Sequence, residues 1–207
     1  MHRVFSGEGR AELTADQVEA LTRLSDGVRG LIEATVLTDV DPAELTQITE
    51  TLAGLTGRLR AGRRTTPPVV AVDGRGIVRQ PASPVSGELN PIAPPIEMTA
   101  QPDGTVRAEF TLSAVYEGPA GCVHGGVSAM ILDHLAGAAA LLNGTPGMTA
   151  GLDLRYRRPT PHSAPLTAEA KADRVEGRKT FVEARIFGAD GRSTVEATGV
   201  FVMPRVG

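Results

Sequence analysis

The stretch from Gly121 to Thr149, GCVHGGVSAMILDHLAGAAALLNGTPGMT, carries the strongest structural signal in the chain. Its central part is almost entirely apolar, and Asn143-Gly144 with Pro146 beyond is a typical helix stop. A helix that is apolar on nearly all sides belongs in a protein core. The pattern therefore predicts a long buried helix, whose apolar residues recur at helical spacing: Val127, Met130, Ile131, Leu135, Ala138 and Leu142.

Asp133 is the exception within this helix. Its neighbours three and four residues away are all apolar or glycine. An unpaired buried carboxylate is costly, so this side chain has either a partner, such as a hydroxyl or an arginine, or a chemical role.

The start of the helix is also unusual, because His124-Gly125-Gly126 stands where a capping Ser, Thr or Asp is common. The first N–H groups of a helix are unpaired and carry the positive end of its dipole, so Gly126 N–H is a candidate to stabilise an oxyanion. Seven residues turn a helix by about 700°, so Gly126 and Asp133 face nearly the same way but lie about 10 Å apart along the axis. A two-fold dimer that faces one end to the other would join them.

The residues around this helix resemble those of the hotdog-fold thioesterases, and among them the PaaI-like and THEM-type acyl-coenzyme A thioesterases. The resemblance covers roughly residues 96–206 and leaves the first 95 uncovered. The matching pieces are Tyr116-Glu117-Gly118-Pro119, Val123-His124-Gly125-Gly126-Val127, Leu132-Asp133, Thr149, Tyr156-Arg157-Arg158-Pro159 and Gly177-Arg178-Lys179.

The resemblance implies an α+β hotdog fold, in which an antiparallel sheet wraps round a long central helix, and hydrolysis of acyl-coenzyme A to free acid and coenzyme A. It makes Asp133 the general base or the nucleophile, two routes that both need an ionised carboxylate. It makes Gly126 the oxyanion donor. Thr149 would orient water or the carboxylate, and His124 would bond the carbonyl or shape the turn.

The family pattern also suggests residues that bind the substrate. Coenzyme A carries phosphates, which suit arginine, and it enters as part of the substrate, so no separate cofactor and no metal are expected. The basic residues can equally be ordinary surface charges at strand ends, without a role in binding. The substrate-binding candidates are Gly125, Met130, Arg157, Arg158, Arg178 and Lys179, and the apolar face expected to hold the acyl chain is Ala129, Met130, Ala136 and Ala140.

The chain departs from some relatives at two places. Gly137 stands where some hotdog thioesterases carry a second hydroxyl one turn after the acid, and Glu117 lies where others have Asn or Gln. The first departure assigns the hydroxyl role to Thr149, and the second leaves substrate positioning open.

Other constellations and functions compete with this interpretation. Cys122, His124 and Asp133 can be drawn as a nucleophilic triad, but a buried Cys is usually inert. A metal cluster of histidines with Asp133 is disfavoured, because His134 diverges from it by about 100° on a helix. A non-catalytic acyl-coenzyme A-binding module with the N-terminal helices as its output is the alternative function, and a hydratase acting on enoyl thioesters ranks last.

The N-terminal half predicts two helices. Residues 14–37 are amphipathic with Asp16 as a plausible cap, and Asp41-Pro42 opens a second helix. That helix carries a narrow apolar stripe at spacings of three and four, so we expect a hairpin that docks on the C-terminal domain or on another subunit. The predicted division is a helical hairpin over 1–62, a Pro-rich linker over 63–95 and a hotdog domain over 96–207. The stripe is Leu45, Ile48, Leu52, Leu55 and Leu59.

After Ile96 the apolar period changes to two, which predicts an antiparallel sheet with one buried face. Alternation runs over 106–112, 152–156, 166–172, 182–186 and 195–201. Asp190-Gly191 is a strong hairpin turn, and Asp73-Gly74 in the linker a possible one. We expect the strands after the helix to form a meander.

Composition narrows the class of protein. A net charge of −3 argues against a nucleic-acid binder held by phosphate contacts. Cys122 is the single cysteine, which fits a reducing compartment. The N-terminus has no apolar signal core, and the apolar run at 127–142 contains Asp133 and His134. We therefore expect a cytoplasmic homo-oligomer, a dimer or a dimer of dimers, without a membrane span.

Overall fold

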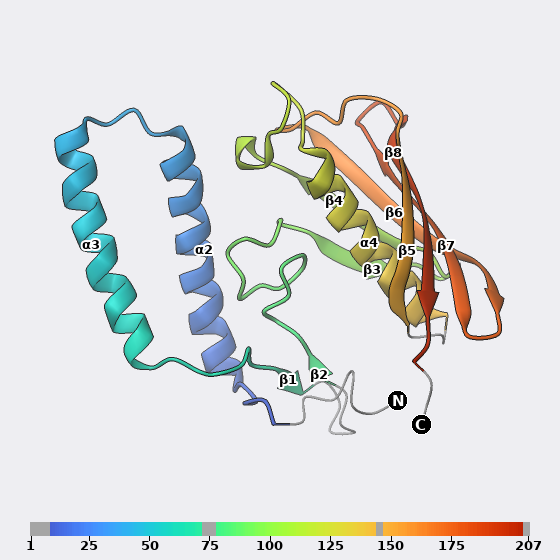
Figure 1. The fold of residues 1–207 in the computed structure, drawn as a ribbon, viewed down its shortest axis with the longest axis horizontal. Coiled ribbons are helices and arrows are strands. Elements are labelled where there is room, and N and C mark those ends of the chain that lie inside the picture. Colours follow the sequence, from blue (N-terminus) through green and yellow to red (C-terminus); the bar gives the residue numbers. More distant parts are fainter. Residues whose placement is uncertain (1–8, 72–77, 144–146, 205–207) are drawn as a thin grey trace.

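The computed structural model describes residues 9–71, 78–143 and 147–204. Two parts are distinct in Figure 1: a pair of long helices, and a sheet that curves round a third helix. The pair consists of α2 (Ala15–Leu37) and α3 (Pro42–Ala61), and the third helix is α4 (Gly125–Leu142).

The sheet has six antiparallel strands in the order β3-β4-β6-β7-β8-β5. The predicted α+β hotdog arrangement is confirmed, and the predicted meander holds for β6 to β8. The first strand after the helix, β5, instead pairs with β8 at the edge, because residues 157–164 cross to the far side before β6 begins. The strands are β3 (Glu97–Ala100), β4 (Val106–Thr111), β5 (Met148–Tyr156), β6 (Pro165–Glu176), β7 (Lys179–Phe187) and β8 (Ser193–Val202).

The core lies between α4 and the inner face of the sheet. Ile131, Leu132 and Leu135 of α4 are fully buried. The facing strand positions include Ala168 and Ala170, whose small side chains let the helix approach the sheet closely. Residues Gly125–Leu142 also have the length and mean hydropathy of a membrane span, but the core helix of a soluble protein meets the same test.

The helix ends follow their capping residues. Thr14, not Asp16, caps α2, because the Thr14 hydroxyl accepts from Gln17 N–H while the Gln17 side chain accepts from Thr14 N–H. Asp16 lies in the first turn instead. Asp41 caps α3 as predicted, and α4 ends at Asn143.

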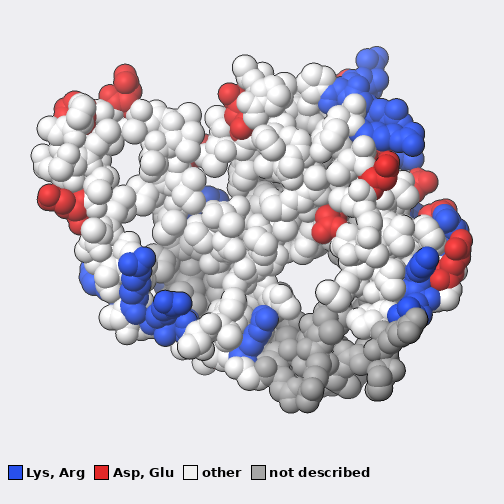
Figure 2. Space-filling model, viewed as in Figure 1, with Lys and Arg blue, Asp and Glu red and all other residues white. Residues whose placement is uncertain are grey.

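The helical hairpin packs against the sheet domain through α2, which contacts the short 3-10 helix Ala114–Tyr116. Ser25 of α2 is buried, and Arg29 donates to the Asn90 carbonyl at 3.3 Å. No residue of α3 is buried. An opening passes between the two helices in the space-filling view (Figure 2). The docking expected of the hairpin therefore applies to α2, and α3 stands outside it.

The segment predicted as a linker folds into short turns against the sheet domain. Pro81, Val85 and Ala93 are buried. A Cβ at Gly87 would lie 2.4 Å from backbone atoms of Pro81 and Ser83, so the turn admits only glycine there. Further upstream, β1 (Val70–Ala71) pairs with β2 (Val78–Arg79), and the turn predicted at Asp73-Gly74 lies outside the described residues.

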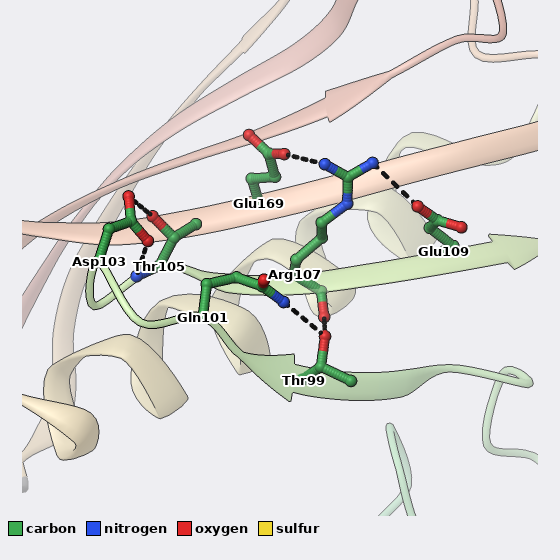
Figure 3. A network of polar contacts seen from close by, with 7 residues as sticks. All are labelled: Thr99, Gln101, Asp103, Thr105, Arg107, Glu109 and Glu169. Atoms are coloured by element: carbon green, nitrogen blue, oxygen red, sulfur yellow. Dashed lines mark hydrogen bonds and ion pairs between the residues drawn. The ribbon is translucent and has the colours of Figure 1, made fainter.

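Polar side chains on and around β3, β4 and β6 form a network of hydrogen bonds and ion pairs (Figure 3). Arg107 of β4 donates to Glu169 of β6 at 3.0 Å and to Glu109 at 2.9 Å. The turn at Asp190-Gly191 is confirmed, with Gly191 at φ 71° and Asp190 accepting from Arg192 N–H. One polar and one apolar face is what the period-two pattern predicts.

Shortening a buried side chain of α4 should destabilise the protein. We expect Leu135→Ala to lower the free energy of unfolding by about 2–5 kcal/mol, because Leu135 is fully buried and its removal leaves a cavity. Leu141→Ala, at a position on the same helix that is 56% exposed, should cost less than about 1 kcal/mol. Urea denaturation measures both, and equal losses would contradict the assigned core.

Candidate active site

Asp133 has a hydroxyl partner from the edge strand. Thr149 at the start of β5 donates from Oγ1 to Asp133 Oδ1 at 2.9 Å. The resemblance implied that Thr149 orients water or the carboxylate, and the structure contains the contact with the carboxylate. Asp133 is half-buried and Thr149 is exposed, so the pair sits where the core meets solvent.

A cavity of about 530 Å³ opens beside this pair. Gly137 lies one turn after Asp133, and a Cβ there would meet the Phe201 ring in van der Waals contact, at 3.4 Å. The cavity is bounded by Asp133, His134, Thr149, Gly137 and Gly147 and by the apolar residues Met98, Ala138, Leu141, Met148 and Phe201.

The apolar wall of the cavity differs from the predicted one. Ala136 and Ala140 are fully buried in the core and face the sheet. The predicted acyl-binding face is therefore wrong at these two positions. Their small side chains allow close packing of the helix on the sheet and do not border the cavity. Gly137, Ala138 and Leu141, on the adjoining side of the helix, border the cavity instead. Met130 is half-buried and is not one of the residues that line the cavity.

His134, also in the cavity wall, ties α4 to the Pro-rich segment. Its Nε2 lies 2.7 Å from Ser86 Oγ. Burial lowers the pKa of His134 below its ordinary value of 6.5, and the neighbouring Asp133 charge opposes that shift. Sequence reasoning missed this contact, since Ser86 is 48 residues away in a segment with no periodic pattern.

Internal hydrogen bonds fix the glycine turn at the start of α4. Gly126 N–H donates to His124 Nδ1 at 3.0 Å, and the Tyr156 hydroxyl donates to the Gly125 carbonyl at 2.9 Å. His124 therefore shapes the turn, one of its two predicted roles. To donate to a substrate carbonyl, Gly126 N–H would have to give up its hydrogen bond to the His124 ring. Tyr156 belongs to the family motif, but the sequence did not predict its hydrogen bond to Gly125.

The loop before this turn is closed by a second hydrogen-bonded group. Glu117 Oε2 accepts from Gly121 N–H at 3.1 Å and lies 2.7 Å from His162 Nε2. These two contacts, the Gly121 N–H foremost, hold the pKa of Glu117 below its usual range. Glu117 thus orders the loop that leads into α4.

The rival constellations find no support in the described residues. His134 and His162 belong to separate pairs, with Ser86 and Glu117 respectively. Across the described ranges, no three His, Cys, Asp or Glu side chains are grouped so as to hold a metal ion.

The predicted phosphate-binding cations lie at two ends of the sheet. Arg157 follows the end of β5 and pairs with Glu196 at 2.8 Å, and Arg158 contacts the Ser193 carbonyl. Arg178 and Lys179 lie at the β6–β7 turn, beside the end of β8. Basic side chains gather where β8 begins, at the upper right of Figure 2. A single protomer therefore does not bring the four cations together.

Comparison with known proteins identifies the family. Residues 120–195 match the model of the thioesterase superfamily. The crystal structure of a thioesterase superfamily protein aligns with this one at a TM-score of 0.80, and the two sequences are 38% identical. The alignment covers 93% of this chain and 97% of the other. The chain belongs to the thioesterase superfamily. The structural match extends well into the N-terminal helices, which the resemblance in sequence left uncovered.

Curated relatives match less than half of this superfamily member. The acyl-coenzyme A thioesterases THEM4 of Mus musculus and of Xenopus laevis are each 36% identical over 87 residues, which is 42% of this chain. The matched segment spans 37% and 39% of those two relatives.

The His134 contact should make stability depend on pH. In the unfolded chain the imidazole takes up a proton near pH 6.5, whereas in the folded protein it does so only at lower pH. Between these values the unfolded state binds more protons, so the contribution is present above pH 6.5 and is lost as pH falls below it.

We expect the unfolding temperature of the wild type to fall more steeply from pH 7.5 to pH 5 than that of His134→Gln, which retains a polar group and does not titrate. Differential scanning fluorimetry of both proteins in matched buffers gives the comparison. Parallel curves would show that His134 is not the group responsible.

Proposed function

We propose that this protein hydrolyses acyl-coenzyme A thioesters to a free acid and coenzyme A. The observation that carries the proposal is the Asp133 carboxylate, held by Thr149, in the wall of a largely apolar cavity in a thioesterase superfamily chain. The mouse and Xenopus relatives named as acyl-coenzyme A thioesterases support the substrate class.

Two routes are open to the carboxylate. As a general base, Asp133 takes a proton from water, the water oxygen bonds to the thioester carbonyl carbon, and the carbon–sulfur bond breaks. As a nucleophile, it forms an acyl anhydride with loss of the thiolate, and water then hydrolyses the anhydride. A thiol with a pKa near about 8.5 is a good leaving group, so neither route needs a dedicated general acid.

We further propose that a second protomer completes the site. Strand β5 is at the sheet edge, and Met148 and Tyr156 at its two ends are 59% and 55% exposed. Two β5 edges paired antiparallel across a two-fold axis would bring the Thr149 end of one chain to the Tyr156 end of the other. Because Tyr156 binds the Gly125 carbonyl, this pairing would place Asp133 near Gly126 of the partner subunit.

The same pairing would gather the cations. Lys179 and Met148 both pair with Val202, so Lys179 and Arg178 lie at the start of β5, whereas Arg157 and Arg158 follow its end. Antiparallel pairing would bring one pair of cations to the other pair across the interface. These four side chains are then candidates for the phosphates of coenzyme A.

A second candidate function is a module that binds acyl-coenzyme A without cleaving it. The hydrogen bond from Gly126 N–H to His124 favours this function, since the predicted oxyanion donor already has an acceptor in this structure. Acyl-coenzyme A binding without release of free thiol would distinguish this function from hydrolysis.

The catalytic assignment predicts unequal effects of two substitutions. We expect Asp133→Asn to lower kcat at least about 100-fold, since it removes the base or nucleophile and preserves shape. Thr149→Ala should lower kcat about tenfold with little change in KM, because it only disturbs the carboxylate's orientation.

Glu109→Gln is the matched control, because this exposed acid lies on β4, away from the β5 edge. Thiol release from short, long and aromatic acyl-coenzyme A substrates measures all three variants. Wild-type turnover by folded Asp133→Asn would rule the catalytic assignment out.

A further inference from the structure

Helix α3 carries an apolar stripe that its own chain covers only in part. Ile48 and Leu52 are half-buried, while Leu45, Leu55 and Leu59 are 40%, 46% and 57% exposed. No residue among the twenty of α3 is buried. Aligned leucines on a helix face are normally covered in the working protein, because their burial is favourable.

Helix α2 does not close this stripe. Its docking face is turned to the sheet domain, where Ser25 is buried and Arg29 binds the Asn90 carbonyl. Leu24 on α2 remains 41% exposed. In Figure 1 the hairpin stands to one side of the sheet domain with α3 outermost. The exposed fractions of Leu45, Leu55 and Leu59 leave the stripe accessible to another molecule.

The spacing of the stripe is that of a coiled-coil seam. Leu45, Leu52 and Leu59 are seven residues apart and occupy equivalent heptad positions, with Ile48 and Leu55 at the second apolar position. Such a seam packs best against another seam of the same kind. A second copy of α3 is therefore a fitting partner.

The charges beside the seam set the orientation of that partner. Glu44 lies in the first turn of α3 and Arg58 in its last. The two are fourteen residues apart, which is two heptads, so they share one flank of the seam. The acidic and basic ends of the hairpin are visible at the left of Figure 2. An antiparallel copy places Glu44 opposite Arg58 at both ends of the seam, whereas a parallel copy leaves the two charges at opposite ends.

We propose that two copies of this chain associate through antiparallel pairing of their α3 helices across a two-fold axis. The contact is separate from the β5 edge and does not rest on thioester hydrolysis. With both contacts formed, the protein is a closed dimer of dimers. With α3 pairing removed, it falls back to the smaller unit.

Sedimentation velocity of the full chain tests this surface. We expect Leu55→Gln/Leu59→Gln to halve the mass of the assembly, since both leucines are exposed within one chain and their replacement leaves its fold intact. Val175→Gln, at a 49% exposed position in β6, is the matched control and should retain the wild-type mass. An unchanged mass in the double leucine variant overturns the proposal.

Charge reversal tests the orientation independently. Glu44→Arg and Arg58→Glu should each raise the dissociation constant of the contact about tenfold, and the double reversal should restore it. Recovery in the double variant requires these two positions to face each other across copies. If both single variants associate like the wild type, or the double variant fails to recover, antiparallel α3 pairing is wrong.

Discussion

The burial of α4 in the concave face of the sheet is the constraint on which the rest of the structure depends. Ile131, Leu132 and Leu135 have no exposed surface, and the facing strands offer alanines that let the helix sink between them. With the helix fixed by packing, every other side chain on it has a fixed position. Asp133 is held at the border of the core for this reason, without an ion pair in the described residues.

The same packing leaves the candidate site open on one side. The sheet covers α4 fully at β6 and β7, but β5 is an edge strand whose end residues are exposed. The cavity beside Asp133 lies at this open side, and the glycine turn at the other end of the helix is tied to the far end of β5 through Tyr156. Within one protomer, Asp133 and Gly126 are thus kept apart by seven residues of α4.

The sequence predicted the features that depend on local pattern. The α4 helix, the strand alternation, the Asp41 cap and the Asp190-Gly191 turn all follow from residues close in the chain. The position of β5 beside β8 was not predicted, because a crossover leaves no mark on alternation. Ser86 beside His134 depends on a Pro-rich segment whose turns are set by contacts with the domain. The apolar wall was misplaced at Ala136 and Ala140, since an alanine that packs against a sheet looks the same in sequence as one that borders a cavity.

The central claim is that Asp133 acts with the glycine turn of a neighbouring chain, and mixing two inactive variants tests it most directly. Gly126→Pro removes the backbone N–H together with its hydrogen bond to His124 Nδ1, and Asp133→Asn removes the carboxylate. Each variant alone should release little thiol. After co-refolding in equal amounts, the account predicts recovery to about a quarter of wild-type turnover, because half of the dimers are mixed and each mixed dimer has one intact site. No recovery, with mixed dimers shown to form by mass spectrometry of differently tagged chains, would contradict a site shared between protomers.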